Sequence, residues 1–203
     1  MLLRTMGKKL TLTDEQLRDA VAKAREGDQE AFGQIYHHFF DQIYRYSAFR
    51  VPTEIAEDLV ADVFVKAWEK LHTYKPQKNV PFSAWLFRIA RHTVIDAYRS
   101  QRPTEEMPEE LVDRDTLNRA ETAVERNELL RTVRGAMEKL PARYREVLEL
   151  TFMADLPHSE AARVLRLSEG AVRILKFRAL KRLEQLLPEN MREGLPQMTA
   201  EPA

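Results

Sequence analysis

The chain has 203 residues, which is room for one large or two small domains. Its 32 Lys plus Arg are balanced by 32 Asp plus Glu, which excludes a uniformly basic surface but allows segregated charge. The absence of cysteine excludes a disulfide framework and a thiolate metal site. No apolar run reaches the length of a membrane span and the N-terminus lacks a secretory signal, so we expect a soluble, cytoplasmic protein without membrane insertion.

Long stretches with a 3.6-residue period, and only six glycines, predict an all-α fold. Residues 13–16 have the pattern of a capping box, which opens a helix through Arg25. Asp28 is expected to cap a second helix, which Pro52 ends. Thr53 is expected to cap a third. The inward side of this third helix carries Ile55, Leu59, Val63, Ala67 and Leu71, and its other side carries Glu57, Asp58, Asp62, Lys66 and Glu69.

The polar segment 72–81 contains two prolines and is predicted to be a loop. Its two lysines, Tyr74, Gln77 and Asn79 offer stacking and hydrogen-bonding groups suited to splayed bases, although its composition also fits an ordinary connection.

The stretch 82–99 is predicted to form a helix with two different faces. One face is apolar and carries Phe82, Leu86, Ile89, Ala90, Thr93 and Ala97. The opposite face is basic and carries Arg88, Arg91, His92, Ile95, Arg99 and Arg102, with Trp85 and Asp96 at the border. Arginines in a row can neutralise phosphates, and an aromatic at the margin can stack on an unpaired base. A solvated surface with a core tryptophan is the alternative.

Residues 104–115 hold six acids and one base and follow Pro103, which predicts a flexible acidic linker and a domain boundary. A functional alternative is an RNA-like mimic in a basic channel. Beyond the linker we expect helices over 117–139 and 142–152. Then come a helix over 156–164, a short turn, and a last helix capped by Ser168, with the spacing of a helix-turn-helix. The tail from Pro188 lacks periodicity and is expected to be disordered.

The last helix has an unusual outer surface. Its core stripe is Val172, Leu175, Ala179 and Leu183. Facing away or flanking are Arg173, Ile174, Lys176, Phe177, Arg178, Lys181 and Arg182. Residues 163–182 contain seven bases and one acid. A recognition helix uses arginines for guanine edges and apolar groups for thymine methyls, which fits this surface.

Five motifs in this order resemble the extracytoplasmic-function (ECF) sigma factors of the sigma-70 family. They are residues 28–36, 56–68, 82–92, 140–147 and 168–173. The resemblance covers residues 28 to 187, and the order and separation of the motifs make it highly specific. It implies two small helical domains: region 2 over 14–102 and region 4 over 117–187. They would be joined by the acidic linker 103–116 and followed by a disordered tail, 188–203.

The resemblance also implies a function: a transcription initiation factor that binds bacterial RNA polymerase core, selects a promoter and helps to melt its minus-10 element. The implied partners are the core enzyme, through its beta-prime clamp helices and beta flap, promoter DNA and an anti-sigma factor. Residues matching the polymerase-binding positions are Asp58, Asp62, Phe64, Lys66 and Trp68. Minus-10 candidates are Tyr74, Lys75, Lys78, Asn79, Phe82, Trp85, Arg88, Arg91, His92 and Arg99. Minus-35 candidates are Arg173, Ile174, Lys176, Phe177, Arg178 and Lys181.

Three positions depart from the family pattern. His92 stands where asparagine is frequent, Arg166 stands in the turn where glycine is common, and residues 174–176 replace a more usual Ser-Arg-Leu. The fold tolerates these changes, but a minus-35 sequence preference cannot be carried over.

The sequence has no Walker loop, no His-Glu-x-x-His and no Gly-x-Ser-x-Gly, so we expect no enzyme activity and no cofactor. His37 and His38 would point about 100° apart on a helix, which suits a metal poorly. Two alternatives remain: a sigma mimic that titrates an anti-sigma factor, and a stand-alone helix-turn-helix repressor. The basic stripe and the 74–82 loop argue against the first, and the helix over 54–71 argues against the second.

Overall fold

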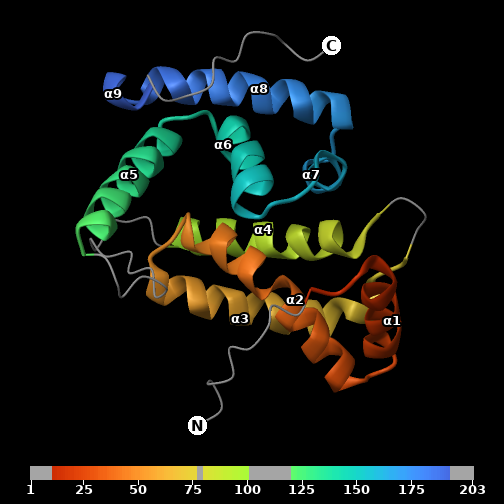
Figure 1. Ribbon diagram of the computed structural model, residues 1–203. Coiled ribbons are helices and arrows are strands. Elements are labelled where there is room, and N and C mark those ends of the chain that lie inside the picture. The colour runs from red at the N-terminus through yellow and green to blue at the C-terminus, as the bar shows by residue number, and fades with distance from the viewer. Residues whose placement is uncertain (1–10, 77–79, 101–119, 193–203) are drawn as a thin grey trace.

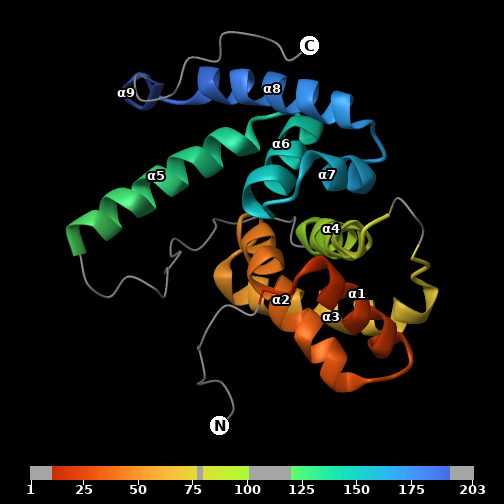
Figure 2. The same ribbon diagram turned by 45° about the vertical axis from the view of Figure 1, so that its right-hand side comes forward.

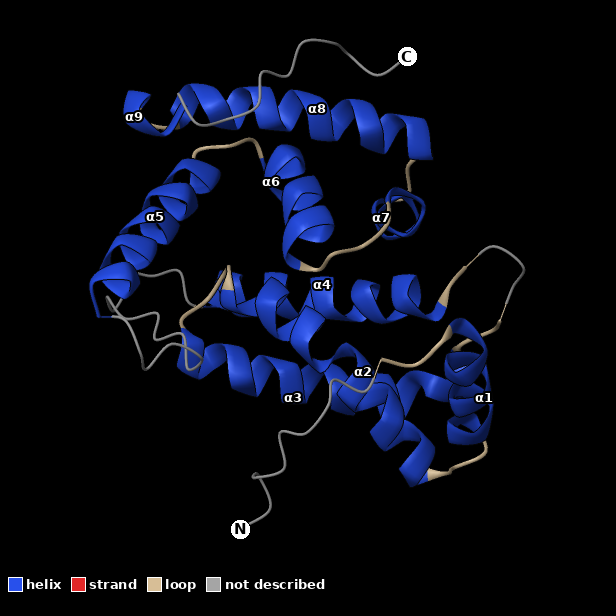
Figure 3. Ribbon diagram, viewed as in Figure 1, coloured by secondary structure: helices blue, strands red, loops and turns tan. Residues whose placement is uncertain are grey.

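The computed structural model describes residues 11–76, 80–100 and 120–192, and every regular element in these ranges is helical (Figure 3). The helices form two bundles, an N-terminal bundle of α1–α4 and a C-terminal bundle of α5–α9. The predicted acidic linker, residues 103–116, lies outside the described residues. The all-α prediction is confirmed.

The N-terminal bundle consists of α1 (Asp14–Arg25), α2 (Gln29–Ala48), α3 (Thr53–Lys70), a 3-10 turn η1 (Leu71–Thr73) and α4 (Phe82–Ser100). Thr13 forms the predicted capping box, because its backbone N–H donates to Gln16 Oε1 at 2.9 Å and its hydroxyl accepts from the Gln16 N–H. The third helix begins one residue earlier than predicted. Thr53 is its first residue and Pro52, in an extended conformation, occupies the cap position without a side-chain bond.

The core of this bundle is built where α2, α3 and α4 meet. Tyr46 of α2 and Phe87 of α4 are both wholly buried, with ring centroids 5.9 Å apart and planes at 84°. Phe87 is not on the predicted apolar stripe of α4. The stripe is wider than predicted because α4 lies between α2 and α3 on one side and the C-terminal bundle on the other (Figures 1 and 2).

The C-terminal bundle consists of α5 (Ala120–Glu138), α6 (Ala142–Leu148), a π-helical turn η2 (Glu149–Met153), α7 (His158–Leu165), α8 (Glu169–Leu186) and α9 (Glu189–Arg192). Its core includes Val147, Leu150, Ala161, Val172 and Ala179. Ser168 caps α8 as predicted, since its hydroxyl accepts from the Ala171 N–H at 3.2 Å. The turn between α7 and α8 passes through Arg166, whose φ of 57° and ψ of 46° lie in the left-handed region.

Two features of this bundle differ from the sequence expectation. The predicted helix over 142–152 loosens into η2, where the Thr151 hydroxyl donates to the Val147 carbonyl at 2.8 Å. The tail was expected to be disordered from Pro188, yet one helical turn, α9, forms. It is held by Arg192, which donates to the carbonyls of Leu187 and Gln185 at 2.7 and 3.0 Å. Residues 193–203 lie outside the described part of the chain.

The two bundles lie against each other. Helix α4 packs on α7, and α2 packs on η2, so that α4 lies between the lower and upper helices in Figure 1. In Figure 2, α4 is seen nearly end-on in the same position. Among the described helices, none has the length and apolar character needed to cross a bilayer.

Candidate functional site

The outer face of α3 carries the first group of predicted residues. Asp58 and Asp62 are exposed, and Lys66 is half-buried with its ammonium donating to the Thr93 hydroxyl of α4 at 3.3 Å. Phe64 is only 4% exposed and packs on Tyr36 and Phe32, so it lies in the core beneath this face. The structure therefore places the two aspartates at the surface, and Phe64 below it.

Two further features of the α3 face concern aromatic and apolar side chains. Trp68 is half-buried, with its ring 4.8 Å from that of Phe32. Val65 is 57% exposed, which makes it an apolar side chain among the charges of this face. Val65 was not predicted as a site residue, although its position outside the 3.6-period apolar stripe was an available signal.

An aromatic cluster lies where the 72–81 segment meets α4. The rings of Tyr74, Phe82 and Trp85 lie 5.2 to 5.4 Å apart, and the Tyr74 hydroxyl donates to the Val80 carbonyl at 3.2 Å. Burial raises the pKa of Tyr74, and Arg25 opposes that shift. Tyr74 and Phe82 are buried, whereas Trp85 is half-buried. The first two therefore brace the loop, and the Trp85 ring keeps an accessible part.

The remaining predicted minus-10 residues outside the arginine pair of α4 are either exposed or outside the described residues. Lys75 and His92 are exposed. Lys78 and Asn79 lie outside the described residues, and so does the side chain of Arg99.

Arg88 and Arg91 of α4 are half-buried, and both bind the C-terminal bundle. Arg88 donates through Nε and Nη2 to the Arg163 carbonyl of α7, at 3.2 and 2.6 Å. Arg91 forms a two-pronged ion pair with Glu146 of α6, in which Nη2 lies 3.3 Å from Oε2 and Nε binds Oε1. Of the predicted basic stripe, Arg88 and Arg91 therefore lie against the other bundle, and Arg102 lies outside the described residues.

A second ion pair joins the bundles beside the first. Arg50, just after α2, donates through Nε to Glu149 Oε2 at 2.7 Å, and its Nη2 binds the same oxygen. Glu149 is wholly buried, and Arg145 Nε lies 3.9 Å from its other oxygen. Burial raises the pKa of Glu149, while Arg50, by charge and hydrogen bond, and Arg145 oppose that shift.

These contacts and the neighbouring Arg134, which donates to the Ala48 carbonyl at 2.6 Å, form a continuous polar interface that we call the seam. The seam consists of Arg50, Arg88, Arg91, Arg134, Glu146 and Glu149. A cavity of about 360 Å³ lies along it, lined in part by Phe49, Ile95 and Met137. Sequence reasoning did not single out Arg50, Arg134, Glu146 or Glu149. No local pattern pairs residues that lie so far apart in the chain.

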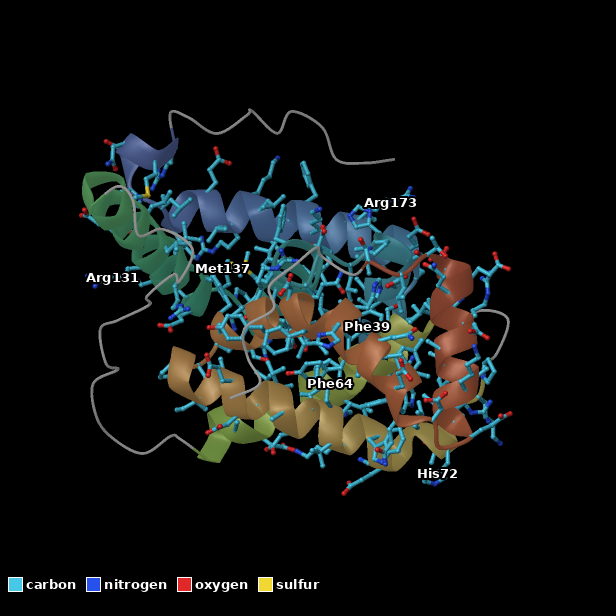
Figure 4. All side chains as sticks on the ribbon, turned by 60° about the horizontal axis from the view of Figure 1, so that its bottom comes forward. Phe39, Phe64, His72, Arg131, Met137 and Arg173 are labelled. Carbon is cyan, nitrogen blue, oxygen red and sulfur yellow. The ribbon has the colours of Figure 1, made fainter. Side chains whose placement is uncertain are left out.

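The outer surface of α8 carries the last group. Arg173, Ile174, Arg178 and Lys181 are exposed, and α8 lies on the side of its bundle away from α4 (Figure 1). Figure 4 shows Arg173 on α8, apart from the core residues Phe39 and Phe64. Arg173 donates to Glu169 at 2.6 Å.

Two other predicted residues of α8, Phe177 and Lys176, are half-buried. The ammonium of the exposed Lys181 lies 4.8 Å from the centroid of the Phe177 ring, so that it covers an aromatic side chain that would otherwise meet solvent. The Lys176 ammonium lies 4.4 Å from the centroid of the Phe152 ring and 3.5 Å from His158 Nε2. Burial lowers the pKa of Lys176. Lys176, one of the six predicted minus-35 residues, is therefore turned toward its own bundle and not toward the outer surface of α8.

Within the described ranges, no cluster of three or more His, Asp or Glu has the arrangement of a metal site. The adjacent histidines have separate surroundings, since His38 Nδ1 accepts from the Leu12 N–H at 2.9 Å and the His37 ring contacts Tyr36.

Comparison with known proteins shows which family the chain resembles. Residues 35–104 match Sigma-70 region 2, and residues 130–183 match Sigma-70 region 4. The chain is 33% identical over 180 residues to the ECF RNA polymerase sigma factor BldN of Streptomyces coelicolor, a match that covers 87% of this chain and 68% of BldN. It is 35% identical to the RNA polymerase sigma factor CnrH of Cupriavidus metallidurans, covering 84% of this chain and 93% of CnrH.

The chain belongs to the sigma-70 family, as an ECF sigma factor.

The solved structure of CnrH in complex with the cytosolic domain of CnrY has the same fold. It aligns with a TM-score of 0.64 at 31% identity, covering 84% of this chain and 96% of the solved one. Region 2 of this sigma factor corresponds to the N-terminal bundle, and region 4 corresponds to the C-terminal bundle with the helix-turn-helix of α7 and α8. As a sigma factor, the protein is a transcription initiation factor.

Proposed function

We propose that the protein binds the core of bacterial RNA polymerase through the outer face of α3. Asp58, Asp62 and Lys66 would contact the beta-prime clamp helices, and Val65 would add an apolar contact at their centre. This arrangement is supported by an exposed valine that no part of the described chain covers, flanked by exposed carboxylates. Interfaces often combine such an apolar centre with a polar rim. Region 4 would contact the beta flap.

Promoter DNA would be held by two surfaces with different tasks. On α8, Arg173, Ile174, Phe177, Arg178 and Lys181 would read the minus-35 duplex in a major groove. Near α4, Trp85 would stack on an unpaired minus-10 base, with Tyr74 and Phe82 fixing its position. Arg88, Arg91, His92 and Arg99, with Lys75, Lys78 and Asn79 of the loop, would hold the backbone of the melted strand.

The observation that carries this proposal is the exposed basic surface of α8 in the same chain as the braced Trp85. Run-off transcription with purified core polymerase on a matching promoter tests it. A sigma factor of this kind gives a product of defined start, which requires both proteins. A sigma mimic gives no product although it binds an anti-sigma factor, and a repressor protects DNA without polymerase.

Several finer assignments follow from the same proposal. The protein itself catalyses no reaction, because polymerase performs the chemistry, and it works in the cytoplasm where that enzyme works. Region 2 would extend over 14–102 and region 4 over 117–187, with 103–116 as the linker. An anti-sigma factor would be a further partner. The similarity to CnrH, solved with a bound domain of CnrY, supports a protein partner of this kind.

A further inference from the structure

We propose that the cavity along the seam is a binding site for a small organic carboxylate: a molecule with one carboxylate group, an apolar ring, and a hydroxyl or N–H group that donates a hydrogen bond. Such a ligand is a partner beyond polymerase, promoter DNA and an anti-sigma factor. Among the described residues that line the cavity, Arg91 alone is also assigned to DNA.

The cavity has the size and the wall of a small-molecule site. Its volume is about 360 Å³, at the small end of the range of roughly 300–1,000 Å³ in which such sites fall. Apolar side chains of both bundles line it, since Phe49 follows α2, Ile95 belongs to α4 and Met137 belongs to α5. Small-molecule sites combine such a wall with a few polar groups that fix the orientation of the ligand. This wall suits an apolar body of the size of a single aromatic ring.

The charged side chains of the cavity favour an anion. Among the described residues, four arginines and three glutamates line it, which leaves an excess of one positive charge. Arg50 and Arg91 are already paired with Glu149 and Glu146. One carboxylate neutralises the excess, whereas a phosphate monoester, with a charge of about −1.5 to −2, would exceed it. The charge of the lining therefore favours a carboxylate over a phosphate.

Arg134 of α5 is an incompletely satisfied cation in this lining. Its Nη2 donates to the Ala48 carbonyl at 2.6 Å, and its Cζ lies 5.5 Å from the centroid of the Phe49 ring. Its Nε is buried and has no hydrogen-bond partner among the described residues. Burial lowers the pKa of Arg134, and the charge of Glu138 opposes that shift. Because a buried donor without an acceptor is unfavourable, a ligand carboxylate would supply the acceptor that Nε lacks.

Glu149 presents the complementary group, an acceptor without a donor. Its side chain is wholly buried, and its Oε2 accepts both hydrogen bonds from Arg50. Its Oε1 has no hydrogen-bond partner among the described residues, since Arg145 Nε, 3.9 Å away, is too distant to donate to it. A ligand hydroxyl or N–H would donate to this oxygen. One molecule that carries an acceptor and a donor would therefore satisfy both Arg134 and Glu149.

Four related probes test this chemistry group by group. The molecule para-hydroxyphenylacetate carries the carboxylate, the ring and the donor. Phenylacetate lacks the donor, tyrosol replaces the carboxylate by a neutral alcohol, and acetate lacks the ring. Isothermal titration calorimetry on the full chain measures each affinity. We expect para-hydroxyphenylacetate to bind once per chain with roughly millimolar affinity or better, as for a fragment of its size. The other three should bind about tenfold more weakly, because each lacks one of the three contacts.

Substitutions in the lining locate the bound probe. Arg134→Met removes the guanidinium and keeps an unbranched side chain. Its matched control is Arg131→Met, at an exposed arginine of the same helix that does not line the cavity. Ala142→Phe fills the cavity from an exposed position at the start of α6 and leaves the charges unchanged. Arg134→Met should weaken binding of para-hydroxyphenylacetate about tenfold and Ala142→Phe should abolish it, whereas Arg131→Met should leave it unchanged.

Circular dichroism melting shows that each variant is folded, and Ala142→Phe alone decides the test if Arg134→Met is not. Absence of saturable binding by the parent overturns the site. Binding that persists in Ala142→Phe, or that weakens equally in Arg131→Met, places the probe elsewhere and also overturns it. Equal affinity for phenylacetate excludes Glu149 as an acceptor, and equal affinity for tyrosol excludes an anion. Run-off transcription tests the proposed function separately, so none of these failures affects it.

Discussion

The ammonium of Lys176 lies over the ring of Phe152, 4.4 Å from its centroid, rather than beside the exposed guanidinium of Arg173 three residues earlier. The same helix therefore carries one basic residue that braces the domain and another that is exposed on the outer surface, where it pairs with Glu169 of its own helix. Sequence spacing alone placed both on the DNA-binding surface.

This difference predicts opposite effects for two substitutions on α8. Arg173→Ala should weaken binding of a cognate minus-35 duplex by about 1–3 kcal/mol, because a two-pronged contact to a base edge is lost. Lys176→Met should leave that affinity nearly unchanged and lower the melting temperature of region 4, since a cation–π contact is lost. Fluorescence anisotropy and thermal melting measure the two effects. Equal losses of DNA affinity would show that Lys176 reaches DNA after all.

Reversing the charge of the α3 face should abolish association with polymerase. Asp58→Arg with Asp62→Arg leaves the core intact, because both side chains are exposed, and it replaces attraction by repulsion across the interface. Co-purification with core polymerase measures the effect. The control is Glu26→Arg with Asp41→Arg, two exposed carboxylates elsewhere in region 2. Stoichiometric recovery of polymerase by the α3 variant would exclude this face as the binding surface.

Replacing the left-handed residue of the helix-turn-helix should stabilise region 4. Arg166 has φ of 57°, a conformation that costs an ordinary residue about 1–2 kcal/mol and glycine almost nothing. After the greater flexibility of glycine in the unfolded chain is subtracted, Arg166→Gly should add about 0.5–1 kcal/mol. Arg163→Gly, inside α7, is the matched control and should lose about 1 kcal/mol. Denaturant unfolding measures both, and equal signs would contradict the backbone argument.

His158 should make region 4 less stable in mild acid. Burial lowers its pKa, the positive charges of Lys176 and Arg173 lower it further, and Glu169 opposes them. The unfolded chain then binds the proton first, so this contribution is fully present above about pH 6.5 and is lost as the pH falls toward the lowered folded value. His158→Gln should flatten that part of the melting profile. His92→Gln, at an exposed histidine, should not.

Removing one arginine of α4 should also change the salt dependence of promoter binding. Arg88→Ala in the complex with polymerase should lower the slope of log affinity against log salt by about one, because one phosphate contact is lost. Titration at several salt concentrations measures the slope. A slope equal to that of the parent would mean that Arg88 contacts no phosphate in the open complex.

Local chemistry explains which features were predictable from the sequence. The capping box at Thr13 and the cap at Ser168 depend on residues a few positions apart, and both are confirmed. The apolar stripe of α8 is equally local: Val172 and Ala179 are buried, and Leu175 and Leu183 are half-buried against the core. The pairing of Arg50 with Glu149 joins residues 99 positions apart, and no period reports it. For the same reason the width of the buried face of α4, which includes Phe87, was underestimated. Phe87 packs on Tyr46 of α2, and α4 also packs on α7 of the second bundle, and local pattern places neither neighbour.

Both sides of the seam belong to a single polypeptide, and this determines how their contact depends on protein concentration. Glu146 and Glu149 are tethered to the arginines they bind, so their effective concentration is fixed by the connection between the bundles and not by how much protein is present. Dilution does not release them. The fraction of molecules in which the two bundles are in contact is therefore independent of the total concentration of the protein.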